Sequence, residues 1–341
     1  MTLDEIIQDF DKLSQKSYRA KQVYKWLCGG AESFAEMTNL PKDFRETLNE
    51  YYFIPSISVE SKRVASDGTI KYLFKLYDGE FVESVLMKYN HGYSICISTQ
   101  VGCKMGCSFC ATGKSGYKRN LNASEMLGQI YAAQDDEKIK ISNVVLMGMG
   151  EPLDNYDNVI KFLKLVSEPD GLNIGHRHIS VSTCGLVDKI YKLADENLQI
   201  TLSISLHAPN DELRSSMMRI NNRWNINDLI TACKYYTKKT HRRISFEYTM
   251  VNNVNDDKGC ALQLADLLKG MLCHVNLIPL NDSQTDDLKR SNIRKIYFFR
   301  DFLQSHGINA TVRRTLGKDI EAACGQLKGK HLSQESLKGV E

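Results

Sequence analysis

Apolar residues in the first fifty positions recur at the three-and-four spacing of amphipathic helices. The first stripe consists of Leu3, Ile6, Ile7, Phe10 and Leu13. A second pattern runs from Ala20 to Leu27, and Pro41 stands where a third helix can begin and continue to Tyr51. The pattern predicts a small helical accessory domain at residues 1–55.

The second of these helices carries basic and aromatic side chains, at Trp26 and in the stretch Tyr18-Arg19-Ala20-Lys21-Gln22. Such a surface suits RNA binding, and it equally suits an amphipathic helix with a solvated basic face. The sequence leaves both interpretations open, with the N-terminal domain as a candidate for RNA binding.

Residues 56–90 change to a strand pattern interrupted by two turn dipeptides, Asp67-Gly68 and Asp78-Gly79. These predict an antiparallel β extension with strands at Lys71–Tyr77 and Glu80–Lys88. In the second strand one carboxylate, Glu83, shares a face with apolar residues. Burial would raise the pKa of Glu83 toward that of a general base. A solvent-facing glutamate is the commoner outcome, and the pattern alone favours it.

From residue 91 to residue 327 short β-rich runs alternate with helical patterns, which predicts a parallel sheet and a partial (β/α) barrel of the α/β class. The predicted strands are Tyr93–Ser98, Asn143–Leu146, His178–Ser182, Thr201–Ser205, Ile244–Met250, His274–Ile278 and Ala310–Arg313. The predicted helices are Ala123–Gln134, Asn158–Val166, Asp188–Asn197, Ile226–Thr237, Cys260–Leu268 and Ile293–His306. Such a barrel carries its chemistry at the C-terminal strand ends. Residues 328–341 form a polar tail.

The composition is that of an ordinary soluble chain of 341 residues, with a net charge of only +3. No apolar run approaches the ~20 residues that a membrane helix needs. The acidic N-terminus does not resemble an export signal, and ten cysteines without export predict a reducing cytoplasm where thiols bind metals or do chemistry. We expect a cytoplasmic protein, without membrane association, that acts as a monomer.

Three closely spaced cysteines, Cys103, Cys107 and Cys110, follow the first predicted barrel strand. A four-iron cubane normally takes four thiolates, so three local ligands leave one iron open for chemistry. Phe109, directly before the last cysteine, is placed to pack over the cluster. A structural zinc site usually needs a second Cys-x-x-Cys or histidine pair, which this sequence lacks. The loop therefore favours a reactive iron–sulfur centre.

Glycine-rich and polar residues stand at the ends of the later predicted strands. Gly150 and Glu151 belong to a Gly-Met-Gly-Glu-Pro loop, where a carboxylate can accept from an ammonium group. Further hydrogen-bonding candidates on the same rim are Ser182, Ser205, Leu206, His207 and Asn281. Each alone would more often be structural. Beside a metal loop, cofactor contacts are the better interpretation.

Two more cysteines lie near this rim in the predicted fold. Cys96 shares one strand face with Ser94 and Ser98, and this face would point into the barrel. Cys324 lies after the last strand, beside Gly325, on a loop that we expect to be exposed. A free cysteine is usually buried and packs like a small hydrophobic residue. We expect this role for Cys28, Cys184, Cys233, Cys260 and Cys273.

The cysteine loop resembles the signature of the radical S-adenosylmethionine (SAM) enzymes. The wider set of motifs, in this order along nearly the whole chain, resembles the RlmN family within that superfamily. The motifs are Ser94 to Asn120, the Gly-Met-Gly-Glu-Pro loop, Ser205-Leu206-His207-Ala208-Pro209, Val275-Asn276-Leu277-Ile278-Pro279 and the ending Asp319–Leu327.

The resemblance implies a radical SAM methyltransferase that methylates carbon 2 of adenine 2503 in 23S rRNA and of adenine 37 in tRNAs. Its cofactors would be a 4Fe-4S cluster and SAM, and a further partner would be an electron-donating reductant. In the family a thiolate matching Cys324 takes a methyl group from one SAM. A 5′-deoxyadenosyl radical from a second SAM then activates that methyl, which adds to adenine.

The resemblance also assigns the remaining roles. A thiol matching Cys96 releases the product and leaves a Cys96–Cys324 disulfide, and a base matching Glu83 removes the carbon 2 proton. Gly150, Glu151, Ser182, Ser205, Leu206, His207 and Asn281 match the SAM-binding positions. Arginines that suit either RNA phosphates or a solvated surface are Arg214, Arg219, Arg223, Arg242, Arg243, Arg313 and Arg314.

Two rival functions remain. The sister branch methylates carbon 8 of the same rRNA adenine and confers antibiotic resistance; Pro152 and Pro279 look more like the carbon 2 branch. A rival of another class is a non-enzymatic RNA-binding module whose cysteine loop holds zinc.

Overall fold

The computed structural model describes residues 1–55, 57–281 and 288–327, so the predicted tail at 328–341 lies outside the described residues. The first fifty residues are helical, as predicted: α1 (Leu3–Lys12), α2 (Ser17–Cys28), η1 (Phe34–Glu36) and α3 (Lys42–Tyr51). A capping box between Thr2 and Glu5 starts α1. The rings of Phe10 and Phe44 pack edge to face, with centroids 5.5 Å apart, and join α1 to α3.

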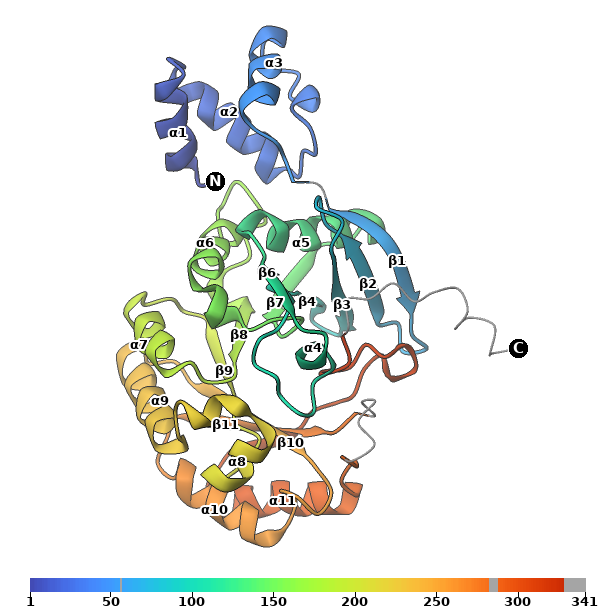
Figure 1. The fold of residues 1–341 in the computed structure, drawn as a ribbon, viewed down its shortest axis with the longest axis vertical. Coiled ribbons are helices and arrows are strands. Elements are labelled where there is room, and N and C mark those ends of the chain that lie inside the picture. The colour runs from blue at the N-terminus through green and yellow to red at the C-terminus, as the bar shows by residue number, and fades with distance from the viewer. Residues whose placement is uncertain (56, 282–287, 328–341) are drawn as a thin grey trace, which may run out of the picture.

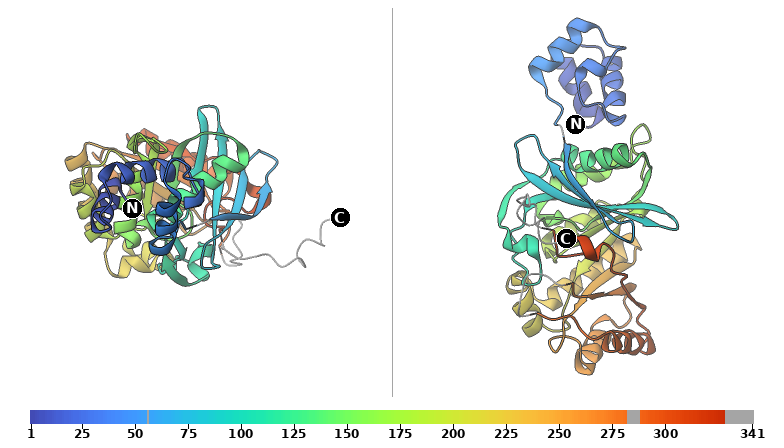
Figure 2. Two further views of the ribbon diagram at one scale, coloured as in Figure 1. Left: turned by 90° about the horizontal axis from the view of Figure 1, so that it is seen from above. Right: turned by 90° about the vertical axis from the view of Figure 1, so that its right-hand side faces the viewer.

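The N-terminal helices lie at one end of the molecule, next to α5 and α6 (Figures 1 and 2). Two polar contacts tie them to the rest of the chain. Lys161 on α6 (Tyr156–Val166) pairs with Glu5 at 2.6 Å, and Tyr131 on α5 (Ala123–Glu137) donates to the Cys28 carbonyl at 2.7 Å. Both contacts are partly exposed and each contributes little on its own.

A sheet of ten strands forms the centre of the protein, in the order β1-β2-β3-β4-β7-β8-β9-β10-β11-β12. The first pairs are antiparallel, and from β4 onward every pair is parallel. β1 and β12 are its two edges, so the sheet is open. The strands are β1 (Ser58–Val64), β2 (Ile70–Lys75), β3 (Phe81–Tyr89), β4 (Gly92–Cys96), β7 (Ile141–Leu146), β8 (Ile179–Thr183), β9 (Thr201–Ser205), β10 (Ile244–Met250), β11 (Cys273–Pro279) and β12 (Ala310–Val312).

The helices between the parallel strands pack on the outside of the curved sheet (Figure 1). Besides α5 and α6 they are α7 (Val187–Asp195), α8 (Asp211–Met217), α9 (Ile226–Thr240), α10 (Lys258–Leu268) and α11 (Ile293–Ser305), with short turns η2 (Pro152–Asn155), η3 (His176–His178) and η4 (Arg219–Asn222). Valine, isoleucine and leucine side chains that are almost fully buried fill the space between the layers. The predicted α/β class is confirmed, and the predicted strands and helices fall within a few residues of the observed ones.

The prediction that the cysteine loop follows the first barrel strand directly was wrong. A separate hairpin of β5 (Gln100–Gly102) and β6 (Tyr117–Asn120) intervenes, with α4 (Ala111–Lys114) inside it. The two strands approach each other closely at Gly102, which has φ +78°. Only glycine fits there, because a Cβ would overlap the Gly116 carbonyl. The hairpin therefore holds both ends of the cysteine loop together.

The last described segment, residues 313–327, crosses back over the sheet toward the cysteine loop and contains η5 (Lys318–Ile320). We call it the C-terminal segment. Its backbone is fastened at both ends: Gly317 N–H donates to Asp67 at 2.9 Å, and Gly325 carbonyl accepts from Ala111 N–H at 2.8 Å. The loop around Cys324 is therefore largely buried, and the expectation of an exposed loop was wrong. Among the described residues no helix is long and apolar enough to cross a membrane.

Candidate active site

The cysteine loop sits where several elements meet. Ser108 N–H donates to the carbonyl of Met217 at the end of α8 at 3.0 Å, and Cys110 N–H donates to the Cys107 carbonyl at 3.2 Å. A Cβ on Gly113 would lie 3.2 Å from the Cys107 nitrogen, so α4 packs closely against the loop. Backbone contacts therefore fix the loop, and the three thiols remain available for ligation.

The electrostatics of the loop fit a metal centre. Burial raises the pKa of Cys103 to about 12, and it raises the pKa of Cys107 as well, with the charges of Cys110 and Cys103 adding to the effect. Three half-buried thiolates in one loop therefore repel one another unless a cation compensates them. In the described chain no three His, Cys, Asp or Glu side chains form a group that could hold one metal ion. A cubane binds each cysteine to a different iron, so it does not require the three thiols to meet at one ion.

The Gly-Met-Gly-Glu-Pro loop follows β7 and packs against β5. Gly150 has φ +105°, and a Cβ there would lie 2.6 Å from the Gln100 side chain. Glu151 is buried, and its carboxylate oxygens accept the backbone N–H groups of Leu153 at 3.0 Å and Cys184 at 2.7 Å. Burial raises the pKa of Glu151, and those two N–H groups oppose the rise. The carboxylate links the ends of β7 and β8, and the side chains of Thr183 and Cys184 also hydrogen-bond to it.

His207 has the best-defined protonation state of the predicted ligands. Its backbone is left-handed (φ +58°), and Nδ1 accepts from Thr249 N–H at 3.0 Å, which places the proton of the neutral ring on Nε2. Burial, and then the charge of Arg214, lower the pKa of His207 to about 3. The ring meets Phe109 edge to face, with centroids 4.7 Å apart. A neutral donor therefore stands beside the cysteine loop.

Ser182 and Ser205 lie on neighbouring strands, half-buried near the C-terminal ends of β8 and β9. The Leu206 side chain is fully buried, so only its backbone can face a ligand. Arg214 is fully buried behind these strand ends, where it donates to the carbonyls of Cys184 at 2.6 Å and Ser205 at 3.3 Å. Its proposed contact with RNA phosphates was wrong, because it is an internal brace.

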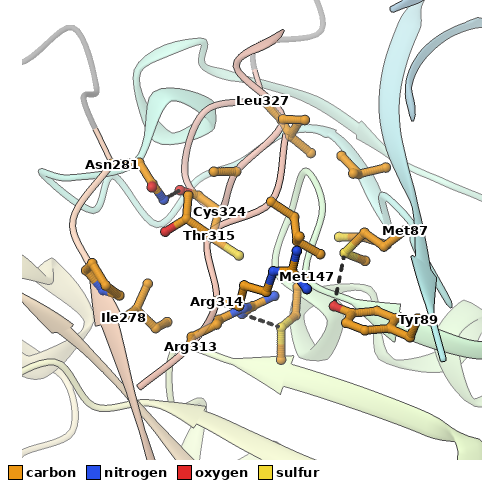
Figure 3. Close-up of a pocket in the computed structure, with 16 residues that line it drawn as sticks. Met87, Tyr89, Met147, Ile278, Asn281, Arg313, Arg314, Thr315, Cys324 and Leu327 are labelled. Atoms are coloured by element: carbon orange, nitrogen blue, oxygen red, sulfur yellow. Dashed lines mark hydrogen bonds between the residues drawn. The ribbon is translucent and has the colours of Figure 1, made fainter. Parts of the chain in front are cut away.

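A second part of the site is a cavity between β3, β4, β11 and the C-terminal segment (Figure 3). Its lining includes Cys96, Met147, Asn281, Arg313 and Cys324. Two thiols that are more than two hundred positions apart in the sequence thus open into one space. Both are free thiols in the structure, so the Cys96–Cys324 disulfide is not present in it.

Asn281 borders this cavity at the end of β11. Its Nδ2 donates to the Cys324 carbonyl at 3.3 Å (Figure 3). Its Oδ1 is buried and has no hydrogen-bond partner among the described residues. An unpaired buried acceptor costs free energy unless a ligand satisfies it. Asn281 therefore fits the predicted role of a cofactor contact.

Arg313 is one of two arginines that line the cavity, the other being Arg314. Its Nη1 lies 3.7 Å from the Met147 sulfur and 4.0 Å from the Glu247 carboxylate. The charge of Cys324 is the largest influence that raises the pKa of Arg313, and Glu247 and Cys96 add to it. Burial raises the pKa of Cys96 to about 12, the Cys324 charge adds to this, and Arg313 opposes it. Cys96 therefore stays a thiol at neutral pH.

Glu83 lies on β3, two positions before the cavity residue Val85, and does not itself line the cavity. Its side chain is 8% exposed and pairs with Lys71 on β2, with Nζ 3.1 Å from Oε1. The solvent-facing interpretation that the strand pattern favoured was therefore wrong. Of the predicted SAM ligands among the described residues, Asn281 alone lines this cavity.

The sequence analysis missed Gln100 and Asp154, which organise the floor of the site. Gln100 is buried, accepts from Glu151 N–H at 2.8 Å and donates to Asp154 at 2.8 Å. Asp154 in turn pairs with Lys104 of the cysteine loop at 2.9 Å. Gln100 stands three residues before Cys103, and this closeness was the only signal in the sequence.

An open α/β sheet that presents a three-cysteine loop and a glycine-rich loop at its C-terminal strand ends defines the class of radical SAM enzymes. A family model of that superfamily matches residues 97–262. A second, described as the ribosomal RNA large subunit methyltransferase N-terminal domain, matches residues 1–54.

Relatives extend the match to the whole chain, which belongs to the RlmN family. It is 52% identical to a probable dual-specificity RNA methyltransferase RlmN of Thermoanaerobacter sp. (strain X514), over 98% of each chain. It is 51% identical to a protein of the same name from Clostridium novyi (strain NT), over 97% of each. The crystal structure of a radical SAM methyltransferase from Sphaerobacter thermophilus is 43% identical, covers 97% of this chain and 98% of that one, and has a TM-score of 0.92.

The buried, neutral His207 predicts a pH effect on stability. Its folded pKa of about 3 lies below the ordinary value near 6.5, so the unfolded chain takes up the proton first and stability falls as the pH is lowered from 6.5. Between pH 7 and pH 5 this residue should account for about 2 kcal/mol of lost unfolding free energy.

Urea titration at the two pH values measures this loss. The His207→Asn variant keeps an acceptor for Thr249 N–H and tolerates the left-handed backbone, so it should lose less stability between pH 7 and pH 5 than the parent. Equal losses in the two proteins would show that His207 is protonated in the folded state.

Proposed function

We propose that this protein methylates carbon 2 of adenine in RNA, at adenine 2503 of 23S rRNA and adenine 37 of tRNAs. The observation that carries the proposal is the cavity into which Cys96 and Cys324 both open. One thiol is enough to accept a methyl group, whereas a second at the same cavity is needed to release it from a covalent adduct. The names of the curated relatives, which are dual-specificity RNA methyltransferases, support RNA as the substrate.

Cys103, Cys107 and Cys110 would hold a 4Fe-4S cluster, with SAM at Gly150, Glu151, Ser182, Ser205, Leu206, His207 and Asn281. When bound, they supply the methyl group and the 5′-deoxyadenosyl radical that an electron-poor ring carbon requires. The rim offers a SAM molecule a carboxylate at Glu151, a neutral N–H donor at His207 and an unpaired acceptor at Asn281. These suit an amino group, a carboxylate and an adenine edge, respectively.

Cys324 is proposed as the methyl carrier. It is half-buried at the cavity, which the Arg313 side chain also lines. The hydrogen bond from Asn281 to the Cys324 carbonyl fixes its backbone on the side of the cysteine loop. Loss of a hydrogen atom from the S-methyl group to the 5′-deoxyadenosyl radical would leave a carbon radical on Cys324 that adds to carbon 2 and joins enzyme to RNA. The unpaired electron that this addition leaves on the ring would return to the cluster, so that the later loss of the carbon 2 proton restores a closed-shell ring.

Cys96 is proposed to release the product. Its sulfur attacks the sulfur of Cys324, so that an S–S bond forms and the bond from Cys324 sulfur to the one-carbon unit breaks. The electron pair of the broken bond stays with the one-carbon unit, which takes a proton and becomes the methyl group. A dithiol reductant then restores both thiols. Burial keeps Cys96 protonated until this step, which limits premature reaction.

Glu83 is proposed as the base that takes the proton from carbon 2. Glu83 lies two residues before Val85 on β3, so it shares a strand face with Val85 and Met87. Both of these residues line the cavity. The helical N-terminal region is proposed to bind RNA, and the protein is proposed to act in the cytoplasm as a monomer. Methylation of carbon 8 of the same rRNA adenine is the alternative outcome.

Analysis of nucleosides separates these outcomes. RNA from cells that lack endogenous adenine methylation and express this protein should contain 2-methyladenosine in both 23S rRNA and tRNA. Mass spectrometry with authentic 2-methyl and 8-methyl standards makes the measurement. Appearance of 8-methyladenosine would move the protein to the sister branch, and no methylated adenosine would remove the enzymatic function.

Cysteine variants test the two thiol roles. Cys324→Ala should abolish methylation, whereas Cys96→Ala should form a covalent protein–RNA adduct that cannot be resolved. Denaturing gels of the purified protein with bound RNA report the adduct. Cys260→Ala, a buried cysteine on α10 outside the cavity, is the matched control and should behave like the parent. A Cys96→Ala protein that turns over normally would exclude the release role.

A further inference from the structure

Lys71 is a buried lysine next to the proposed base. It lies on β2, opposite Val85 in the antiparallel pair with β3, and its side chain is only 8% exposed. The ammonium has two partners, Glu83 Oε1 at 3.1 Å and the carbonyl oxygen of Glu321 at 3.1 Å. Lysine is almost never this deeply buried without a charged partner, because removing the ammonium from water costs several kcal/mol.

The two partners of Lys71 belong to the two halves of the proposed chemistry. Glu83 is the proposed base, and Glu321 lies three residues before Cys324 in the C-terminal segment. The same hairpin that contains β2 holds that segment at its turn, where Gly317 N–H donates to Asp67 and Ser66 N–H donates to Asp319, both at 2.9 Å. The turn alone would hold the start of the segment. Lys71 adds a contact closer to Cys324 that also reaches Glu83.

We propose that Lys71 is a positioning residue for Glu83, holding its carboxylate in place beside the cavity, and that it couples this base to the segment that presents Cys324. The inference rests on the proposed function, since it concerns the base of that reaction. The ammonium contacts the Glu83 carboxylate and the Glu321 carbonyl at the same time, so one side chain joins the proposed base to the C-terminal segment.

The step that Lys71 serves is a proton transfer. The C–H bond at carbon 2 breaks, its electron pair stays with the adenine ring, and the proton passes to a Glu83 carboxylate oxygen. The product is a neutral carboxyl group beside the Lys71 ammonium. Without the lysine, the Glu83 carboxylate would lose the contact that orients it, so proton transfer would become slow and the covalent adduct would persist with its carbon 2 proton in place.

A purely structural role for Lys71 makes a different prediction. A brace between β2, β3 and the C-terminal segment would, when removed, lower stability and slow every step of the reaction equally. It would not make the removal of one particular proton limiting. An isotope effect from deuterium at carbon 2 of the adenine therefore distinguishes a positioning role from a brace.

The test follows the decay of the protein–RNA adduct in single-turnover reactions of the reconstituted full chain with RNA that carries hydrogen or deuterium at carbon 2. In Lys71→Met and in Lys71→Gln the adduct should decay about 100-fold more slowly than in the parent, with a primary deuterium isotope effect that the parent lacks. Lys71→Gln keeps a donor for the Glu321 carbonyl, so it separates loss of charge from loss of the tether. Lys71→Arg should restore most of the rate, and Lys75→Met, an exposed lysine on the same strand, is the matched control.

Glu83→Gln keeps this inference distinct from the proposed function. If the Glu83→Gln adduct decays slowly with an isotope effect while the Lys71→Gln adduct decays like that of the parent, the proposed role of Lys71 is wrong and the proposed base stands. If the Lys71→Gln adduct decays slowly without an isotope effect, Lys71 has only a structural role, and this result also overturns the inference. If Glu83→Gln itself resolves the adduct normally, the proposed base is wrong. Should Lys71→Met not fold, Lys71→Gln and Lys71→Arg still decide.

Discussion

The fastening of the C-terminal segment across the end of the sheet is the constraint on which the rest of the site depends. Cys324 comes after the last strand and has no secondary structure of its own to place it. Hydrogen bonds hold it instead: from Asn281 on β11 to its own carbonyl, from Ala111 on α4 to Gly325, and from Thr112 to Leu327. Because α4 follows the cysteine loop directly, the proposed methyl carrier Cys324 and the proposed cluster ligands share one support.

Burial of charge is the second feature that unites the site. Arg214 braces the strand ends, Arg313 faces two thiols, and Lys71 pairs with Glu83, each largely withdrawn from water. Buried charges are poor sources of stability, because desolvation offsets the attraction between the partners. Their presence is better understood through the proposed chemistry, which would use thiols, a carboxylate base and a neutral histidine in a protected space.

The sequence predicted those parts of the site whose residues are close in the chain. Cys103, Cys107 and Cys110 fall within one loop, and the alternation of strands and helices is a local pattern, so both were readable. The burial of Glu83 was not readable, because its partner Lys71 lies across the sheet and is itself bonded to the Glu321 carbonyl far along the chain. Cys324 was expected on an exposed loop for the same reason: the contacts that bury it come from β11 and α4. The roles expected for Glu83 and Cys324 came from the resemblance to a family, because the pattern of residues along the chain did not indicate them.

The fate of a labelled methyl group tests the central claim most directly. With SAM carrying three deuterium atoms on its methyl group, a carrier that loses one of them at Cys324 and later gains a solvent proton delivers a methyl group with two deuterium atoms to adenine. Mass spectrometry of nucleosides from one turnover of the reconstituted protein gives the count. Two deuterium atoms on carbon 2 is the predicted result; three would mean direct transfer without the Cys324 and Cys96 relay and would contradict the account.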